Sequence, residues 1–103
     1  MVIVEFSIIP LGAEVSVSRL LVPALRELEK RKVKYEITPM CTIFEARNVD
    51  EALNIVGAAH EAIFDADVKR VVTTIRIDDR RDKEESMQEK VKSLKTRLEE
   101  KKS

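Results

Sequence analysis

Acidic and hydroxyl side chains alternate with apolar ones in several short segments of the chain. Four segments carry them: Glu5 and Ser7, then Glu36 and Thr38, then Glu45, then Thr74, Arg76 and Asp78. Two interpretations are open for such residues on a half-buried strand. On a solvent-facing surface the charges are ordinary. If another subunit closes over the surface, the carboxylates must pair with one another or with a cationic, hydrogen-bonding ligand. Arg76 neutralises one acid and weakens the ligand interpretation by that amount.

Metal and covalent chemistry find little support in the sequence. There is no Gly-rich phosphate loop, and no Cys or His pair stands at metal-ligand spacing. His60 is the only histidine, so no serine or cysteine triad is plausible. We predict that His60 is a hydrogen-bonded core residue and that Cys41 is a small apolar filler. The sequence therefore predicts a protein that is not an enzyme, with no metal site and no cofactor.

Composition limits the partners. The chain has 103 residues, of which 44% are hydrophobic and 37% are charged. This suits one globular domain over residues 1–103. Lys plus Arg and Asp plus Glu number 19 each, so no net field attracts nucleic acid or anionic lipid. One cysteine and no apolar run near the ~20 residues of a membrane span favour a cytoplasmic protein without a membrane partner.

The positions of apolar residues predict the elements that carry these side chains. Residues 2–9 alternate as a strand, and Ser16 or Ser18 begins a helix that ends near residues 30–32. Residues 33–47 form two strands joined near Pro39 to Cys41. Asn48 and Glu51 have capping-box spacing before a second helix, whose apolar stripe is Ala52, Leu53, Val56, Ala59, His60 and Ile63. A last strand spans residues 70–78.

This order predicts an α+β, ferredoxin-like βαββαβ fold. In that arrangement both helices cover one face of an antiparallel four-stranded sheet, and the other face has no cover from its own chain. A further C-terminal helix is predicted over residues 83–101. Its apolar residues Met87, Val91, Leu94 and Leu98 are spaced by four, three and four, as in a coiled-coil seam. The seam packs either on its own domain or on a neighbouring subunit.

Several ordered motifs resemble those of the small thiamine-binding proteins of the YkoF-like type. They are Val4 to Gly12 (VEFSIIPLG), Ser16-Val17-Ser18, Thr38 to Glu45 (TPMCTIFE), Arg70-Val71, and Ile75 to Arg80 (IRIDDR) with Asp82-Lys83. The resemblance covers almost the whole chain. Cys41 replaces a glycine common in that family, and Phe44 replaces a smaller aliphatic residue; both changes would reshape a pocket.

The resemblance implies sheet-joined dimers that pair into homotetramers, and binding of thiamine or its pyrimidine precursor without turnover. Thiamine is a cation with an aminopyrimidine, so its site needs a carboxylate, hydroxyls and an apolar or aromatic wall. We predict that Glu45 binds the aminopyrimidine or the thiazolium, and that the remaining ligand-binding residues are Ser7, Ser16, Ser18, Thr38, Thr42 and Phe44. Ser16 and Ser18 have helix capping as an equal alternative. Because a one-residue slip of register exchanges Phe44 and Glu45, the residue that faces the pocket stays open.

The function predicted is that of a carrier, buffer or sensor for thiamine-like molecules in a homo-oligomer. A ligand-free scaffold is the alternative, in which the polar sheet face serves only the subunit contact. An enzyme that uses Glu45 and Asp78 as acid and base ranks last.

Overall fold

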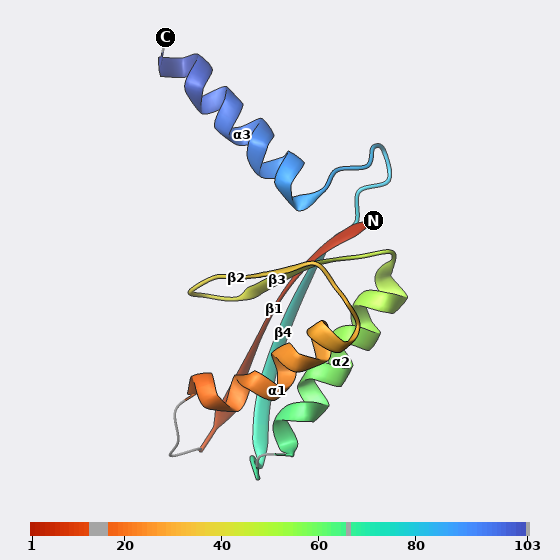
Figure 1. Cartoon of the computed structure of the whole chain (residues 1–103), viewed down its shortest axis with the longest axis vertical. Helices are drawn as coiled ribbons and strands as arrows, with labels where there is room; N and C mark the ends of the chain where they lie inside the picture. The colour runs from red at the N-terminus through yellow and green to blue at the C-terminus, as the bar shows by residue number, and fades with distance from the viewer. Residues whose placement is uncertain (13–16, 66, 103) are drawn as a thin grey trace.

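The computed structural model describes residues 1–12, 17–65 and 67–102. The elements in chain order are β1 (Val2–Leu11), α1 (Val17–Lys30), β2 (Tyr35–Ile37), β3 (Thr42–Ala46), α2 (Val49–Phe64), β4 (Arg70–Asp78) and α3 (Met87–Lys102). The four strands form one antiparallel sheet in the order β2-β3-β1-β4. The α+β fold predicted from the sequence is confirmed: α1 and α2 cover one face of the sheet, and the other face is open (Figure 1).

The core lies between the sheet and these two helices. Alternate residues of β1 are buried against the helices, namely Val2, Val4, Phe6 and Ile8. The open face receives Ile3, Glu5, Ser7 and Ile9, which are half-buried or exposed. β1 continues through Pro10 to Leu11, beyond the predicted end, and pairs there with β4 alone. A proline is tolerated in a strand that has a partner on one side only.

The prediction of Asn48 as the N-cap of α2 is confirmed, but the Glu51 side chain reaches the N–H of Arg47 and not the Asn48 N–H of a standard capping box. Asn48 Oδ1 accepts a hydrogen bond from the Glu51 backbone N–H at 2.8 Å, and Glu51 Oε1 accepts one from the Arg47 backbone N–H at 3.3 Å. The predicted apolar stripe needs one correction: Leu53 is 49% exposed, and Ile55 is buried in its place. Ile55 lies three residues after Ala52 and four before Ala59, so it continues the buried face, whereas Leu53 lies beside that face.

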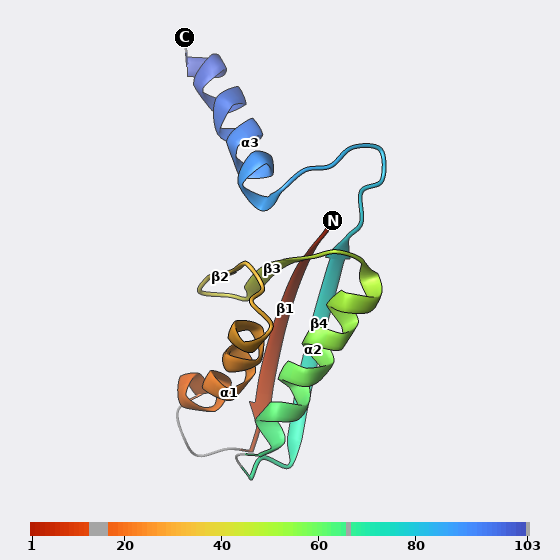
Figure 2. The ribbon, with the colours of Figure 1, turned by 45° about the vertical axis from the view of Figure 1, so that its right-hand side comes forward.

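Helix α3 begins at Met87, four residues later than predicted. Ser86 is its N-cap. The Ser86 hydroxyl accepts a hydrogen bond from the Glu89 backbone N–H at 3.1 Å and donates one to the Glu89 carboxylate. Figures 1 and 2 show α3 extending away from the sheet after a loop that leaves the end of β4. Only Met87 of the seam is buried, while Val91, Leu94 and Leu98 are 51%, 64% and 55% exposed. Beyond its first turn, the seam does not pack on its own domain.

None of the helices in the described residues is long and apolar enough to cross a bilayer.

Candidate functional site

The strand register decides which predicted site residues share a surface. Residues directly opposite in the sheet point to the same side, and Glu45 lies opposite Ile3 while Phe44 lies opposite Val4. Glu45 therefore belongs to the open face and Phe44 to the helix-covered face. The sequence left open which of these two residues faces outward from the core, and the register shows that it is Glu45.

Phe44 is a core residue in this fold. Its side chain is 0% exposed, and its ring meets Phe6 edge-to-face with 5.8 Å between the ring centroids. An aromatic ring in this position contributes packing energy and offers no wall to a ligand on the open face. The sequence grouped Phe44 with Glu45 because alternation alone does not tell which of two adjacent residues faces inward.

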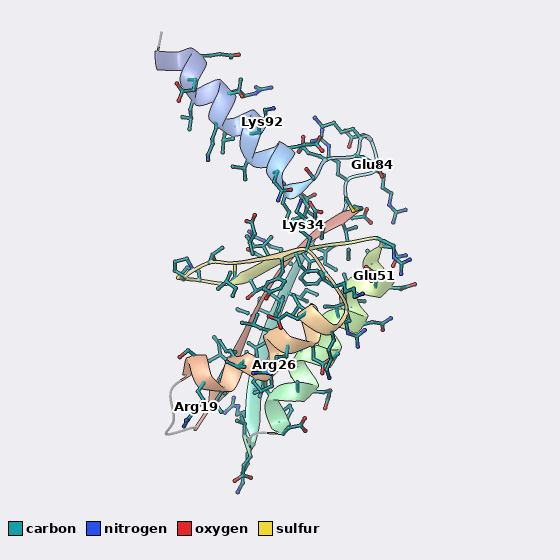
Figure 3. All side chains as sticks on the ribbon, in the orientation of Figure 1. Arg19, Arg26, Lys34, Glu51, Glu84 and Lys92 are labelled. Atoms are coloured by element: carbon teal, nitrogen blue, oxygen red, sulfur yellow. The ribbon has the colours of Figure 1, made fainter. Side chains whose placement is uncertain are left out.

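Glu45 is engaged by the start of α3. Its Oε1 accepts a hydrogen bond at 2.6 Å from the backbone N–H of Met87, so a carboxylate satisfies one of the unpaired donors that open a helix. Two further contacts hold the same turn: Lys34 Nζ donates to Gln88 Oε1 at 2.6 Å, and Lys90 Nζ contacts Asp78. Figure 3 shows Lys34 below the start of α3 and Lys92 on the helix above it. Glu45 in this arrangement fixes α3 to the sheet.

A different hollow gathers other predicted site residues. It has a volume of about 410 Å³ and lies between β1, α1 and the turn that joins β2 to β3. Its apolar wall comes from Leu21 and Leu25 of α1 and from Ile37 and Met40. Its polar groups are Ser7, Thr38, Cys41 and Thr42. We call it the turn hollow.

The edge of β1 adds backbone groups to the turn hollow. β3 pairs with β1 only as far as Phe6, so β1 from Ser7 to Leu11 has β4 on one side and no strand on the other. An unpaired strand edge presents alternating N–H donors and C=O acceptors. Ser7 and Thr42 stand on opposite faces of the sheet, and both border the hollow because it lies at this edge. A flat ring with donors and acceptors on its rim matches such an edge.

Thr38 shapes the turn. Its Oγ1 donates to the Cys41 carbonyl at 2.8 Å and accepts from the backbone N–H groups of Cys41 at 3.1 Å and Met40 at 3.3 Å. A threonine that bonds its own turn in this way holds the turn's backbone in place. Within the described part of the chain, the side-chain hydroxyls of Ser7 and Thr42 form no hydrogen bond. These two hydroxyls are available to a ligand.

A carboxylate adjoins the turn hollow. Cys41 Sγ lies 3.6 Å from Glu5 Oε2, and the other Glu5 oxygen lies 2.7 Å from Nε of Arg76. The Arg76 side chain is 81% exposed, so this ion pair is screened by water and contributes little. Sequence reasoning assigned Cys41 to packing and did not include Glu5 among the ligand-binding residues. The strand register explains why Glu5 and Cys41 are close: Glu5 lies opposite Ile43, two residues after Cys41.

The remaining candidates lie elsewhere. Ser18 is exposed in the first turn of α1 and does not border the turn hollow, and Ser16 lies outside the described residues. His60 has the structural role predicted for it: it is half-buried, and its Nδ1 lies 2.6 Å from Thr73 Oγ1. Over residues 1–12, 17–65 and 67–102, no three His, Cys, Asp or Glu side chains are placed to hold a metal ion.

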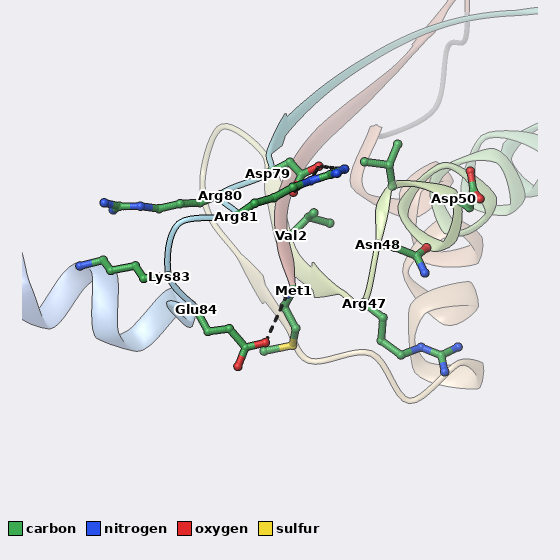
Figure 4. A pocket seen from close by; sticks show the side chains of 11 residues that line it. Met1, Val2, Arg47, Asn48, Asp50, Asp79, Arg80, Arg81, Lys83 and Glu84 are labelled. Atoms are coloured by element: carbon green, nitrogen blue, oxygen red, sulfur yellow. Dashed lines mark hydrogen bonds and ion pairs between the residues drawn. The ribbon is translucent and has the colours of Figure 1, made fainter.

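A larger, charged hollow of about 660 Å³ lies where β1 begins, lined by Arg47, Arg81 and Lys83 among others (Figure 4). Its basic groups are already paired: Arg81 with Asp79 at 2.9 Å, Lys83 with Glu85 at 3.2 Å, and Arg47 with Glu51. Arg80, which also lines this hollow, pairs with Asp82 at 2.7 Å. The partner guanidinium groups lower the pKa of Asp79 and of Asp82. These pairs leave the turn hollow as the better candidate site.

The fold and the turn hollow define a small α+β domain with a partly apolar cleft at a free strand edge. A family described as "thiamine-binding protein" matches residues 4–95. The chain belongs to this family.

Its relatives include a UPF0045 protein of Methanothermobacter thermautotrophicus, 42% identical over 95% of this chain and 100% of the relative. The UPF0045 protein YqgV of Bacillus subtilis is 39% identical over 95% of this chain and 98% of its own.

Solved structures share the fold. Protein MJ1052 of Methanocaldococcus jannaschii superposes with a TM-score of 0.81 at 39% identity, over 90% of this chain and 94% of its own. A candidate thiamine biosynthesis or salvage protein of Thermotoga maritima superposes with a TM-score of 0.74 at 22% identity, over 90% of this chain and 97% of its own. At that identity the second likeness supports the fold alone.

Proposed function

We propose that the protein binds thiamine or a related pyrimidine–thiazole compound, without turnover, and that the turn hollow is the binding site. The family match over residues 4–95 supports the ligand class. One observation supports the position of the binding site: Ser7, Thr42 and Cys41 lie together beside the free edge of β1 and the apolar face of α1.

Each part of thiamine has a counterpart there. The aminopyrimidine is a flat ring with donors and acceptors, which suit the β1 edge and the hydroxyls of Ser7 and Thr42. Leu21, Leu25 and Met40 supply apolar contact for the ring faces. Glu5 contacts Cys41, which lines the hollow, and its carboxylate provides a counter-charge for the cationic thiazolium. Arg76 is exposed enough to release Glu5 in exchange.

Isothermal titration with thiamine and with hydroxymethylpyrimidine tests the proposal. Thr42→Val keeps the shape of the side chain and removes its hydroxyl, which costs about 0.5–1.5 kcal/mol for one neutral hydrogen bond, or about two- to tenfold in affinity. Thr74→Val is the matched control, because Thr74 is exposed on the open face and does not border the hollow. Thiamine recovered unchanged after incubation would agree with binding without turnover.

No heat at millimolar ligand, or equal affinity of the Thr42→Val and wild-type proteins, would overturn this assignment.

The proposal also includes a cytoplasmic homo-oligomer in which dimers pair. The exposed seam of α3 supports association, and light scattering on the full chain measures the subunit number.

A further inference from the structure

The turn hollow is lined by neutral side chains. Among the described residues, those of β1, α1 and the β2–β3 turn that line it are all apolar or uncharged polar, and none is a lysine or an arginine. Residues 13–16, which follow β1 in the chain and lie outside the described residues, contain Glu14 and no basic residue in the sequence. Phosphate groups in proteins are held mainly by charged donors, and these walls supply none.

The basic residues of α1 lie away from the turn hollow. Leu21 and Leu25 line it, and at about 100° per residue Arg19 and Arg26 lie about 100° or more around the helix axis from both leucines. Residues 17–20, the first turn of α1, do not line the hollow. The unpaired N–H groups with which a helix begins can bind a phosphate, but in α1 they belong to this first turn.

The backbone N–H groups of the β2–β3 turn are already hydrogen-bonded. Successive N–H groups in a turn can bind an anion. Here the N–H groups of Met40 and Cys41 both donate to Thr38 Oγ1, at 3.3 and 3.1 Å, and the Thr38 N–H donates to the Cys41 carbonyl at 2.9 Å. The Thr38 hydroxyl therefore occupies the position that an oxygen of a bound phosphate would need.

The ion pair beside the turn hollow also favours a cation over an anion. One Glu5 oxygen lies 3.6 Å from Cys41 Sγ, and the other lies 2.7 Å from Arg76 Nε. The pair has no net charge and so does not attract a phosphate. Arg76 can bind a phosphate only by leaving Glu5, whose carboxylate would then repel that phosphate. A thiazolium has the opposite effect, because it can replace Arg76 at Glu5.

We infer that the turn hollow selects the unphosphorylated ligand: it binds thiamine and discriminates against its monophosphate and diphosphate esters. Thiamine is a cation, whereas each ester has a net negative charge near pH 8, because its phosphate groups carry about two negative charges or more. The inference rests on the proposed function and narrows its ligand class. The bound compound is thus the free alcohol, which a kinase consumes and a phosphatase releases.

Isothermal titration of the full chain with thiamine, thiamine monophosphate and thiamine diphosphate at about pH 8 tests this preference. Met40→Lys adds a cation to the wall of the hollow, at a side chain that is 86% exposed. Leu53→Lys is the control, because Leu53 is 49% exposed on α2 and does not line the hollow. Both substitutions are at exposed positions, so both variants keep the fold, which circular dichroism checks.

The expected wild-type dissociation constant is at least about tenfold lower for thiamine than for either ester. Met40→Lys is expected to reduce this ratio about threefold or more, and Leu53→Lys to leave it within about twofold. A wild-type ratio below about threefold, or tighter binding of an ester, overturns the inference and leaves the proposed function standing. An unchanged ratio in Met40→Lys also overturns it, because the preference then arises outside the turn hollow. If none of the three compounds binds, the proposed function fails and the inference fails with it.

Discussion

Replacing Glu45 by alanine separates two roles for this carboxylate. In the structure it holds the N-terminus of α3 through the 2.6 Å bond from the Met87 N–H, and it does not border the turn hollow. A hydrogen bond to a charged group contributes about 1.5–3 kcal/mol. Because Glu45 is only half-buried and water screens its charge, we expect a contribution at or just below the lower end of that range, about 1–2 kcal/mol. The change acts on the attachment of α3, since the core does not contain Glu45.

Amide hydrogen exchange of Lys90 and Val91 measures that attachment. A loss of about 1–2 kcal/mol raises the population of the detached first turn about 5- to 30-fold, and exchange of these amides rises with it. Glu36→Ala is the control, because it removes one carboxylate from the same face, where Glu36 has no hydrogen bond or ion pair within the described residues. Thiamine affinity of Glu45→Ala is expected to stay within about twofold of wild type.

Unchanged exchange in α3, or the same change in the Glu36→Ala protein, would refute the role of Glu45 as the α3 cap. Loss of thiamine binding while α3 exchange stays at the wild-type rate would place Glu45 in the ligand site, as the sequence first suggested, and would refute the turn hollow.

Three further predictions concern stability and are measured by urea unfolding. Phe44→Ala leaves a void beneath the sheet and is expected to lower the free energy of unfolding by about 3–5 kcal/mol; a loss under about 1 kcal/mol would contradict the core assignment. Asn48→Ala removes the α2 cap and is expected to lower it by about 1 kcal/mol, with Asn54→Ala, an exposed site within α2, as the control. The hydrogen bond from Arg47 lowers the pKa of Glu51 below its ordinary 4.5, so its charge stabilises the fold above that pH, and the advantage over Glu51→Gln disappears as the pH falls through the lowered pKa. An advantage that grows on acidification would show the opposite sign.

Local patterns of the sequence were sufficient for the fold. The alternation in β1 identifies its buried side, and the Asn48–Glu51 pair marks the start of α2, because both signals arise from neighbouring residues. The start of α3 was missed although Ser86 caps it by accepting from the Glu89 N–H, because the charged run before Ser86 resembled the first turn of a helix. The prediction for the buried stripe of α2 included Leu53 and omitted Ile55. The stripe depends on tertiary packing, because both the sheet and the neighbouring helix α1 bury residues of α2.

The candidate site depended on contacts that are distant in sequence. Glu45 has the residue type of a cation ligand, but its partner Met87 is 42 residues away and no local pattern indicates it. Phe44 and Glu45 exchange faces with one step of register, which is set by the pairing of β3 with β1. Ser7 and Thr42 both border the hollow because β3 begins at Thr42, opposite Phe6, and the alternation of apolar residues does not define that strand boundary.

Where thiamine contacts the protein is most directly measured by a ¹H–¹⁵N NMR titration of the full chain. We predict that the largest saturable shifts fall on Ser7, Cys41, Thr42 and the facing residues Leu21 and Leu25 of α1. Largest shifts at Ile3, Glu45 and Asp78, or no saturable shifts at all, would contradict the assignment of the turn hollow as the binding site.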